Sequence, residues 1–537
     1  MMNRLCCVFA ALLLALATTV GATPLDDYVN KPDANYAWYD TKHTIKGLFG
    51  TTIHYINVTS QQWMDTSRAV GPHGTALWTH QVAIIIPKEL KVNGTSMAYL
   101  TGGCNGGTPK PPSATDEDVL VATTVAHMTH GVAIVVFQLP NCKVVFPSDP
   151  SKRPREEDDL IAWAWYQYLE TQDATWLPRL PMTKGAMQSM RAAEEFLGMR
   201  KAGQTGPLPD HGWIASGASK RGWTTWTVGA ATCPSCVRIK GIAPLVPIAP
   251  MIHADMHRQW MSYGGWTFAF EPYLEVNLTT YLDNPVFATD MMAVIDPIHY
   301  PDALARVPKL AVVSSDDEFM SMDWTNIWYD KFQATHGETH LLIAPDSEHS
   351  LATGIPEVIE TVAVFISSIA AGHTESDRPQ FTYTKPDSAT GAITVSVDTT
   401  QWTGPPPKVV LRHAQTTSNT RRDFRWVRLA DNATNACKLP DIPLPTPLFG
   451  GNCIQPIIWI GKTLKPNADD GTGVTTWTGT PPEPLRKGHW TGYYIEFYFK
   501  SDTGMKSDFQ FSTPGFTWPN TLPFPDCHGK ACAGHLL

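Results

Sequence analysis

The chain has 537 residues, a hydrophobic fraction of 43% and a formal net charge of −9 at pH 7. This length exceeds what one ordinary hydrophobic core supports, so we expect two folded domains. The charge is negative and no basic block occurs, which argues against a nucleic-acid partner.

The N-terminus has the pattern of a secretory signal peptide at 1–22. Arg4 supplies a positive charge, residues 5–16 are almost all apolar, and Val20-Gly21-Ala22 provides the small residues of a cleavage site. The apolar run is too short to span a bilayer comfortably, and no later segment is long and apolar enough to do so. We therefore predict a secreted, extracellular protein with no membrane span.

The cysteines and glycosylation sequons agree with that compartment. Two of the ten cysteines lie in the signal peptide, and the even number that remains predicts disulfide bonds. Zinc is an alternative for the C-x-x-C pair, but no second such pair or histidine pair accompanies it, so we expect no metal and no cofactor. Pairing of neighbouring cysteines gives Cys233–Cys236, Cys437–Cys453 and Cys527–Cys532 and leaves Cys104 with Cys142, although connectivity does not follow from sequence. Sequons for N-glycosylation begin at Asn57, Asn93, Asn277 and Asn432.

Apolar runs and helical stretches alternate between about residues 82 and 349, which is typical of a doubly wound, mostly parallel α/β sheet. We assign residues 23–375 to this α/β domain. Within it, a segment at about 250–301 is rich in aromatic residues and methionine, and it forms either a lid or ordinary packed helices. Strands are expected at 82–87, 97–100, 132–136, 213–216, 241–246, 310–315 and 339–344, and helices at 156–169, after Pro181 and from Lys220 onward.

A single serine stands at the apex of a small-residue turn. Ser219 follows the strand expected at 213–216, with Gly217 before it and Gly222 after it. This pattern is typical of a nucleophile elbow, in which a serine hydroxyl stands exposed at a sharp strand-to-helix turn. The usual spacing is G-x-S-x-G; here the second glycine comes one residue later, and a plain Gly/Ser turn is the alternative. We take Ser219 as the candidate nucleophile.

Acidic residues and a histidine follow two later strands. Asp316, Asp317 and Glu318 come directly after the strand at 310–315, and His349 comes shortly after the strand at 339–344. A serine, then an acid, then a histidine, each past the end of a strand, is the triad order of α/β-hydrolases. A random chain would often supply this order, but it would less often place both residues just past a strand. We therefore predict a triad of Ser219, an acid from this cluster and His349.

A glycine-rich turn follows the strand expected at 97–100. Residues 101–107 read Thr-Gly-Gly-Cys-Asn-Gly-Gly. Glycines allow backbone N–H groups to approach a developing alkoxide closely. We predict that the N–H of Gly103 or Cys104, together with that of Lys220, holds the oxyanion; a flexible glycine loop without such a role is the alternative.

The composition changes after about residue 375. Residues 376–537 are rich in Thr, Val and Pro and contain short alternating runs, which predict a small antiparallel β-sandwich. No triad candidate lies there, so we expect this domain to supply no catalytic residue, and its aromatic strands give it enough apolar area for an interface. Strands are expected at 393–397, 409–412, 424–428, 457–460, 493–499 and 509–511.

Several segments carry a resemblance to a known family: Leu25-Asp26-Asp27-Tyr28-Val29, Ser60-Gln61-Gln62-Trp63, Glu157-Asp158-Asp159-Leu160, Leu180-Pro181-Met182-Thr183-Lys184, Ser219-Lys220-Arg221-Gly222-Trp223, Tyr263-Gly264-Gly265-Trp266 and Asp317-Glu318-Phe319. They resemble the PhoPQ-activated pathogenicity-related family, which includes a secreted repressor of proliferation in social amoebae. The resemblance implies an α/β-hydrolase fold, and it selects Asp317 as the acid in preference to Asp316, Glu318 or Asp323. The chain departs from the family pattern after the elbow helix, where an Asp is usual and Cys233-Pro234-Ser235-Cys236 stands instead.

Two functions from different classes fit these observations. In the first, the protein is a secreted serine hydrolase acting on a peptide or an ester: Ser219 attacks the acyl carbon, His349 is the base and Asp317 orients His349. In the second, it is an extracellular signal that represses proliferation or repels cells through a cell-surface receptor, with hydrolysis dispensable or absent. Arg221 either contacts an anionic group of the substrate or forms a structural ion pair.

Overall fold

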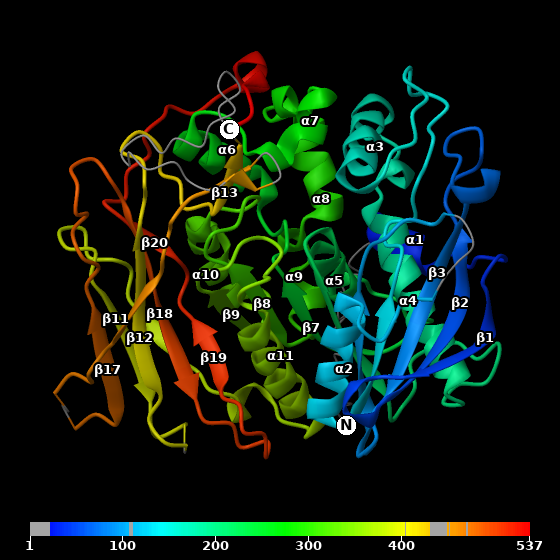
Figure 1. Cartoon of the computed structure of the whole chain (residues 1–537), viewed down its shortest axis with the longest axis horizontal. Coiled ribbons are helices and arrows are strands. Elements are labelled where there is room, and N and C mark those ends of the chain that lie inside the picture. Colours follow the sequence, from blue (N-terminus) through cyan, green and yellow to red (C-terminus); the bar gives the residue numbers. More distant parts are fainter. Residues whose placement is uncertain (1–21, 107–110, 403, 430–447, 450–451, 469–470) are drawn as a thin grey trace, which may run out of the picture.

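The structure is a computed structural model that describes residues 22–106, 111–402, 404–429, 448–449, 452–468 and 471–537 (Figure 1). The predicted signal peptide apart from Ala22, the sequon at Asn432 and the expected disulfide partner Cys437 lie outside these residues. Within the described part of the chain, none of the helices combines the length and apolarity needed to cross a membrane.

A nine-stranded sheet forms the centre of the α/β region. Along the chain its strands are β1 (Ala37–Lys46), β2 (Thr52–Gln62), β3 (Leu77–Ile86), β4 (Val92–Leu100), β5 (Gly131–Val136), β6 (Gly212–Ala218), β7 (Ile239–Leu245), β8 (Lys309–Ser314) and β9 (Thr339–Ala344). Across the sheet their order is β1-β2-β3-β5-β4-β6-β7-β8-β9. In this order, β1, β2, β3 and β5 pair antiparallel with one another. β5, β4, β6, β7, β8 and β9 pair in parallel. This topology confirms the predicted α/β-hydrolase fold.

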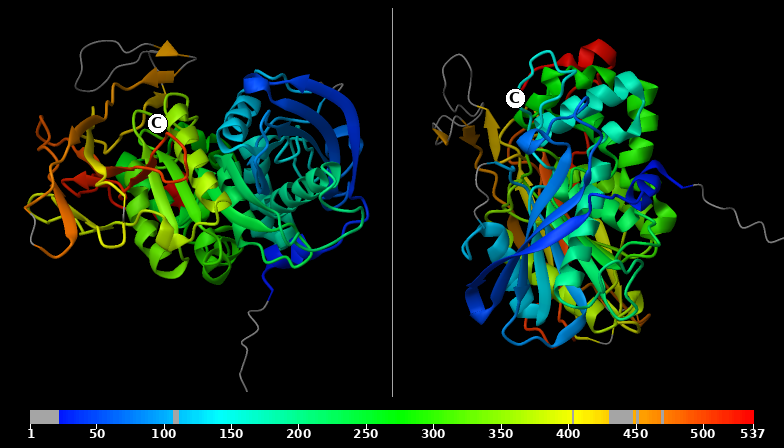
Figure 2. Two further views of the ribbon diagram at one scale, coloured as in Figure 1. Left: turned by 90° about the horizontal axis from the view of Figure 1, so that it is seen from below. Right: turned by 90° about the vertical axis from the view of Figure 1, so that its right-hand side faces the viewer.

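Helices cover both faces of this sheet (Figure 2). Every residue of β5, β8 and β9 is buried, as expected for strands covered on two sides. One face shares an apolar core with α2 (Glu117–Thr129) and α11 (Ile355–Ala370). The other packs against α3 (Glu157–Thr171), α4 (Arg179–Phe196), α5 (Lys220–Ala230) and α10 (Thr325–Thr335), and α1 (Pro24–Asn30) joins the same core.

The segment at about 250–301 is helical and connects β7 to β8. Its aromatic side chains pack on α3: the ring of Trp165 lies 5.5 Å from that of Tyr273 and 6.1 Å from that of Phe287. The segment therefore has a core of its own joined to the α3 face. Its helices are α6 (Ile252–Tyr263), α7 (Glu271–Glu275), a π-helix (Val286–Met291), α8 (Met292–Ile295) and, at the end, α9 (Pro301–Leu304).

The C-terminal region consists of antiparallel sheets, as predicted. The first sheet contains β10 (Thr382–Tyr383), β11 (Ile393–Asp398) and β17 (Val474–Gly479). The second contains β16 (Ile460–Thr463), β12 (Lys408–Gln415), β18 (Thr491–Phe499), β19 (Phe509–Ser512) and β20 (Phe516–Trp518). The third contains β13 (Val427–Leu429), β15 (Asn452–Ile454) and β14 (Leu448–Phe449). The first two sheets share a core in which Val395 and Trp477 join Leu411 and Ile495.

The C-terminal sheets are bonded directly to the α/β region. Ile343 of β9 donates its N–H to Ser512 Oγ (3.1 Å) and accepts a hydrogen bond from the Tyr494 hydroxyl (3.1 Å). The strand expected at 457–460 begins only at Ile460, because the N–H of Trp459 bonds Asp346 Oδ1 (2.7 Å) instead of a neighbouring strand. The division into domains at residues 375 and 376 stays a prediction.

Among cysteine pairs whose two members are both described, three disulfide bonds join cysteines that are near each other in sequence or in the fold. They are Cys104–Cys142, Cys233–Cys236 and Cys527–Cys532, and all three were expected. Among the sequons, Asn93 and Asn277 are exposed, whereas Asn57 is half-buried on β2.

Candidate active site

Ser219 lies in a strained turn between β6 and α5. Its backbone has φ 58° and ψ −126°, a conformation that residues other than glycine rarely adopt. The turn closes only because its neighbours are small: a Cβ atom on Gly217 would lie 2.7 Å from the carbonyl oxygen of Leu100, and one on Gly222 would lie 3.0 Å from that of Gly217. The glycine that comes one residue late in the motif therefore still faces the turn.

The structure brings the three candidate side chains together. Ser219 Oγ lies 2.8 Å from Nε2 of His349, and Nδ1 of His349 lies 2.9 Å from both carboxylate oxygens of Asp317. The side chain of Asp317 is 3% exposed and that of His349 is 15% exposed, so the histidine is the more accessible of the two. Such a chain of hydrogen bonds suits transfer of the serine proton to the imidazole.

Backbone and side-chain donors hold Asp317 in place. Its Oδ1 accepts from the N–H groups of Phe319 (2.7 Å) and Met320 (3.1 Å), and its Oδ2 accepts from the hydroxyl of Ser314 (3.0 Å). These three donors fix the orientation of the carboxylate toward His349. Asp323 lies elsewhere, because it is paired with Arg258 at 2.5 Å and with Arg422 at 3.0 Å.

The electrostatics of the site act on His349. Burial alone would lower its pKa, but the charge and the hydrogen bond of Asp317 outweigh burial, so the pKa of His349 is raised above its ordinary value. The charge of Glu318 also raises the pKa of His349, and its Oε2 accepts the backbone N–H of the same residue (3.0 Å). Burial and the neighbouring Asp317 carboxylate in turn raise the pKa of Glu318 to about 7.

Asp316 joins the acid turn, the histidine turn and the C-terminal sheets. Its Oδ2 accepts from Ser315 Oγ (2.7 Å) and from the N–H of Ser347 (3.1 Å), and its Oδ1 accepts from Nε1 of Trp459 (2.8 Å). Burial raises the pKa of Asp316 well above its usual range, and these donors oppose the rise. Sequence reasoning missed this role of Trp459, because nothing in the sequence relates two residues 143 positions apart.

The predicted oxyanion loop leaves the sheet beside the serine. Leu100, the last residue of β4, pairs with Gly217 in parallel register, so the chain from Thr101 onward departs next to the elbow. In the described part of the chain, the N–H groups of Gly103, Cys104 and Lys220 have no hydrogen-bond acceptor. Their role in holding an oxyanion stays a prediction.

The two cations after Ser219 are tied to carboxylates. Lys220 Nζ lies 2.9 Å from Asp158 and 3.1 Å from Glu157. Arg221 lies 2.5 Å from Glu157 and donates from Nε to the carbonyl oxygen of Leu139. The sequence analysis placed these acids in the helix expected at 156–169 and in a family-matching segment, but it did not relate them to Lys220 or Arg221; a contact of Arg221 with substrate stays a prediction.

An apolar cavity lies beside His349, beneath the helical insertion. The ring of Phe319 lies 4.3 Å from that of His349 and also lines the cavity. The cavity volume of about 20 Å³ accommodates no more than a water-sized group, so it is a small void in the packing of the insertion and not a preformed substrate pocket. The remaining lining residues are Trp165, Ile248, Ile252, Met256, Phe270, Tyr273, Leu278 and Phe287.

The profile of the PhoPQ-activated pathogenicity-related protein family matches residues 25–425. The chain belongs to this family. It is similar to autocrine proliferation repressor protein A of Dictyostelium discoideum, with 34% identity over 525 residues that cover 96% of this chain and 94% of the relative.

Two solved structures similar to this family member are acetyl xylan esterases. Acetyl xylan esterase 1 from a Thermoanaerobacterium species shares 11% identity and a TM-score of 0.38, covering 64% of this chain and 93% of that one. The enzyme from a Paenibacillus species shares 13% identity and a TM-score of 0.37, covering 64% of this chain and 92% of that one.

Replacing Trp459 tests whether the C-terminal region supports the site. Trp459→Phe removes the donor to a buried Asp316 oxygen, so we expect a loss of about 1–3 kcal/mol in the free energy of unfolding. Denaturant unfolding measures this loss, and Trp402→Phe, which removes a bond to Pro405 far from Asp316, is the control. Equal stability of the two variants would contradict the role assigned to Trp459.

Gly102 offers a test of the loop that carries Gly103. A Cβ atom at Gly102 would meet the guanidinium of Arg221, 2.7 Å from its Cζ, so Gly102→Ala must displace the loop or the arginine. We expect labelling of Ser219 by a fluorophosphonate to slow by up to about 100-fold, since small displacements of catalytic groups have such effects. Gly106→Ala, in the same loop with open space around its Cβ position, should label at the wild-type rate.

Proposed function

We propose that this protein is a secreted serine hydrolase of the peptidase or esterase type. The observation that carries the proposal is the relay of 2.8 Å from Ser219 to His349 and 2.9 Å from His349 to Asp317, built on a strained elbow. The predicted signal peptide and the disulfide bonds support secretion.

The geometry supports a two-step acyl transfer. Ser219 Oγ forms a bond to the acyl carbon while its proton passes to Nε2 of His349, and Asp317 stabilises the imidazolium that results. The oxyanion lies against the N–H groups predicted for this role, at Lys220 and at Gly103 or Cys104. Collapse of the tetrahedral intermediate breaks the bond to the leaving alcohol or amine, which takes the proton from His349. Water then repeats the sequence on the acyl-enzyme and releases the acid.

A second candidate function is an extracellular signal that restrains proliferation. The observation that favours it is the similarity to autocrine proliferation repressor protein A along nearly the whole chain. The two functions are separable: purified Ser219→Ala protein, added to cells of the source organism, would retain repression if a receptor reads only the surface. Loss of repression together with loss of labelling would tie the signal to turnover.

A fluorophosphonate probe tests the nucleophile directly. The folded wild-type protein should be labelled covalently, and Ser219→Ala should reduce labelling to background, because the attacking oxygen is removed. Ser388→Ala, at an exposed serine of the C-terminal region, is the matched control and should label normally. A folded wild-type protein that stays unlabelled would remove the main support for hydrolysis.

The pH dependence of labelling tests the role of His349. The imidazole accepts the serine proton only when it is neutral, and its pKa is raised, so labelling should fall on acidification with a midpoint above the ordinary histidine value of 6.5. In Asp317→Asn the charge that raises this pKa is gone; we expect the midpoint to move to lower pH and the rate to drop by about 10⁴-fold. A wild-type midpoint at or below 6.5 would contradict the assignment.

A further inference from the structure

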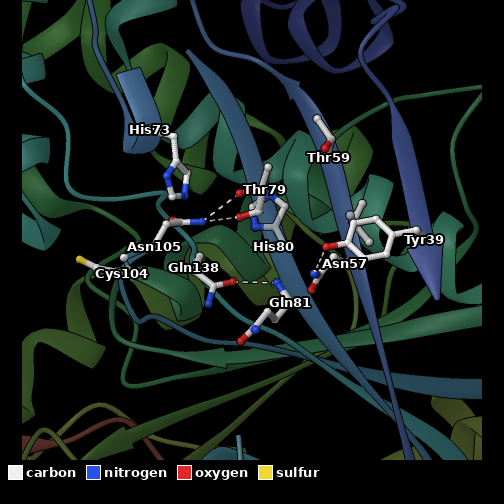
Figure 3. Close-up of a pocket in the computed structure, with 12 residues that line it drawn as sticks. Tyr39, Asn57, Thr59, His73, Thr79, His80, Gln81, Cys104, Asn105 and Gln138 are labelled. Carbon is white, nitrogen blue, oxygen red and sulfur yellow. Dashed lines mark hydrogen bonds between the residues drawn. The ribbon is translucent and has the colours of Figure 1, made fainter. Parts of the chain in front are cut away.

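A polar pocket opens on the antiparallel side of the central sheet and does not include Ser219 (Figure 3). Its volume is about 390 Å³. Residues from β1, β2, β3, the loop after β4 and the turn after β5 line it: Tyr39, Asn57, Val58, Thr59, His73, Thr79, His80, Gln81, Cys104, Asn105, Gly106 and Gln138.

The strand register explains why polar side chains gather here. Tyr39 pairs with Asn57 and Asn57 pairs with Gln81, so these three stand in one row across the sheet, and Thr59 pairs with Thr79 in a second row. Farther along the same face, Tyr55, Ala83 and Ile85 pack with α2. The face thus changes from apolar to polar where the cover of α2 ends.

Among the described residues, the lining carries amides, hydroxyls and the imidazoles of His73 and His80, and it contains no Lys, Arg, Asp or Glu. Four side-chain amides and the hydroxyls of one tyrosine and two threonines belong to it. In the part of the chain that the structure describes, the amide of Gln81 and the hydroxyl of Thr59 have no partner within the protein. They are therefore available to a ligand, and each amide offers both a donor and an acceptor.

The walls of the pocket are fixed by bonds within the protein. Asn105 donates to the carbonyl oxygen (2.9 Å) and to Oγ1 (3.0 Å) of Thr79, and Gln138 Oε1 accepts the N–H of Gln81 (2.7 Å). The N–H of Asn105 also bonds the carbonyl oxygen of Cys142 (2.7 Å), beside the Cys104–Cys142 disulfide. A cavity held in this way loses little conformational entropy when a ligand enters.

We propose that this pocket binds a neutral carbohydrate. Hydroxyl groups donate and accept hydrogen bonds without charge, which matches amides and hydroxyls as partners. The ring of Tyr39 is 61% exposed and bonded through its hydroxyl to Asn57 (2.5 Å), so it offers a flat face at the rim. Among the described lining residues, an anionic ligand would meet no lysine or arginine, and a peptide would meet only Val58 as an aliphatic side chain.

The carbohydrate has two conceivable origins, a glycan attached to the protein or a free saccharide, and both present the same neutral hydroxyl groups. Asn57 lines the pocket and opens the sequon Asn57-Val58-Thr59, so a glycan attached to Asn57 would begin inside the pocket. A free saccharide would enter from solvent. The proposal does not depend on Ser219 being a nucleophile, and fluorophosphonate labelling of the same samples keeps the two questions separate.

Saccharide binding by the unglycosylated protein is the test. Protein secreted to a bacterial periplasm, which forms disulfides without N-glycans, is titrated with N,N′-diacetylchitobiose and with cellobiose and followed by saturation-transfer NMR. We expect binding of at least one saccharide, with a dissociation constant near the millimolar range. Gln81→Ala and Thr59→Val should each weaken it at least tenfold, because they remove groups that bond nothing else in the protein. The control Gln380→Ala, an exposed glutamine bonded to Glu375, should bind normally.

Protein from a eukaryotic secretory host separates the two sources. If mass spectrometry shows Asn57 occupied and free saccharide no longer binds, the attached glycan fills the pocket; if binding persists, the ligand comes from solvent. The proposal is overturned if the folded, unglycosylated protein binds neither saccharide, or if Gln81→Ala and Thr59→Val leave binding unchanged. Binding of mixed unblocked tetrapeptides that Gln81→Ala abolishes, with no saccharide binding, would assign the pocket to peptides instead.

Discussion

The buried carboxyl group of Asp316 is the contact on which the arrangement of the site depends. It joins three segments that are far apart in sequence, through Ser347 after β9, Trp459 in the C-terminal region and the turn after β8 to which it belongs. Asp317 follows it directly, and His349 lies two residues beyond Ser347. The contacts of Asp316 therefore set the relative position of Asp317 and His349, whose side chains are 2.9 Å apart. The carbonyl oxygen of Asp316 also accepts the N–H of Trp426 (3.1 Å). The C-terminal region thus helps to shape the site through Trp426 and Trp459, and the family profile runs beyond α11 to residue 425.

Ser219 is constrained from the opposite side. A backbone conformation of this kind costs about 1–3 kcal/mol and persists only where the surroundings enforce it. The enforcing contacts are the bond from the N–H of Ser219 to the carbonyl oxygen of Leu245 (3.0 Å) and the ion pairs that hold Lys220 against α3. Contacts with β7 and α3 therefore hold the elbow in place, while contacts with the C-terminal region hold the turns that carry the histidine and the acid. Loss of either set of contacts would misalign the relay without touching its three members.

The sequence predicted the parts of the fold that bury continuous apolar runs. The parallel strands were found because β5, β8 and β9 are buried along their whole length. β1 and β2 were missed, since polar residues such as Asn57 and Thr59 interrupt their apolar pattern, and these same residues line the polar pocket. Chain order and strand ends led to Ser219 and His349, whereas composition could not separate Asp316 from Asp317, which are chemically equal neighbours with different partners. The contact between Asp316 and Trp459 arises from tertiary packing, which no local sequence pattern encodes.

The distribution of charge around the site constrains what it can accept. Lys220 and Arg221 follow the serine directly, yet both are neutralised by Glu157 and Asp158, and each has little exposed surface. A buried cation that already has a carboxylate partner gains little from a second anion, because the first partner has compensated its desolvation. On the His349 side the ring of Phe319 packs against the imidazole, and the described lining of the separate polar pocket contains no Lys, Arg, Asp or Glu. Both cations next to Ser219 are thus already paired with carboxylates, and the elbow offers no ready counter-charge to an anionic group.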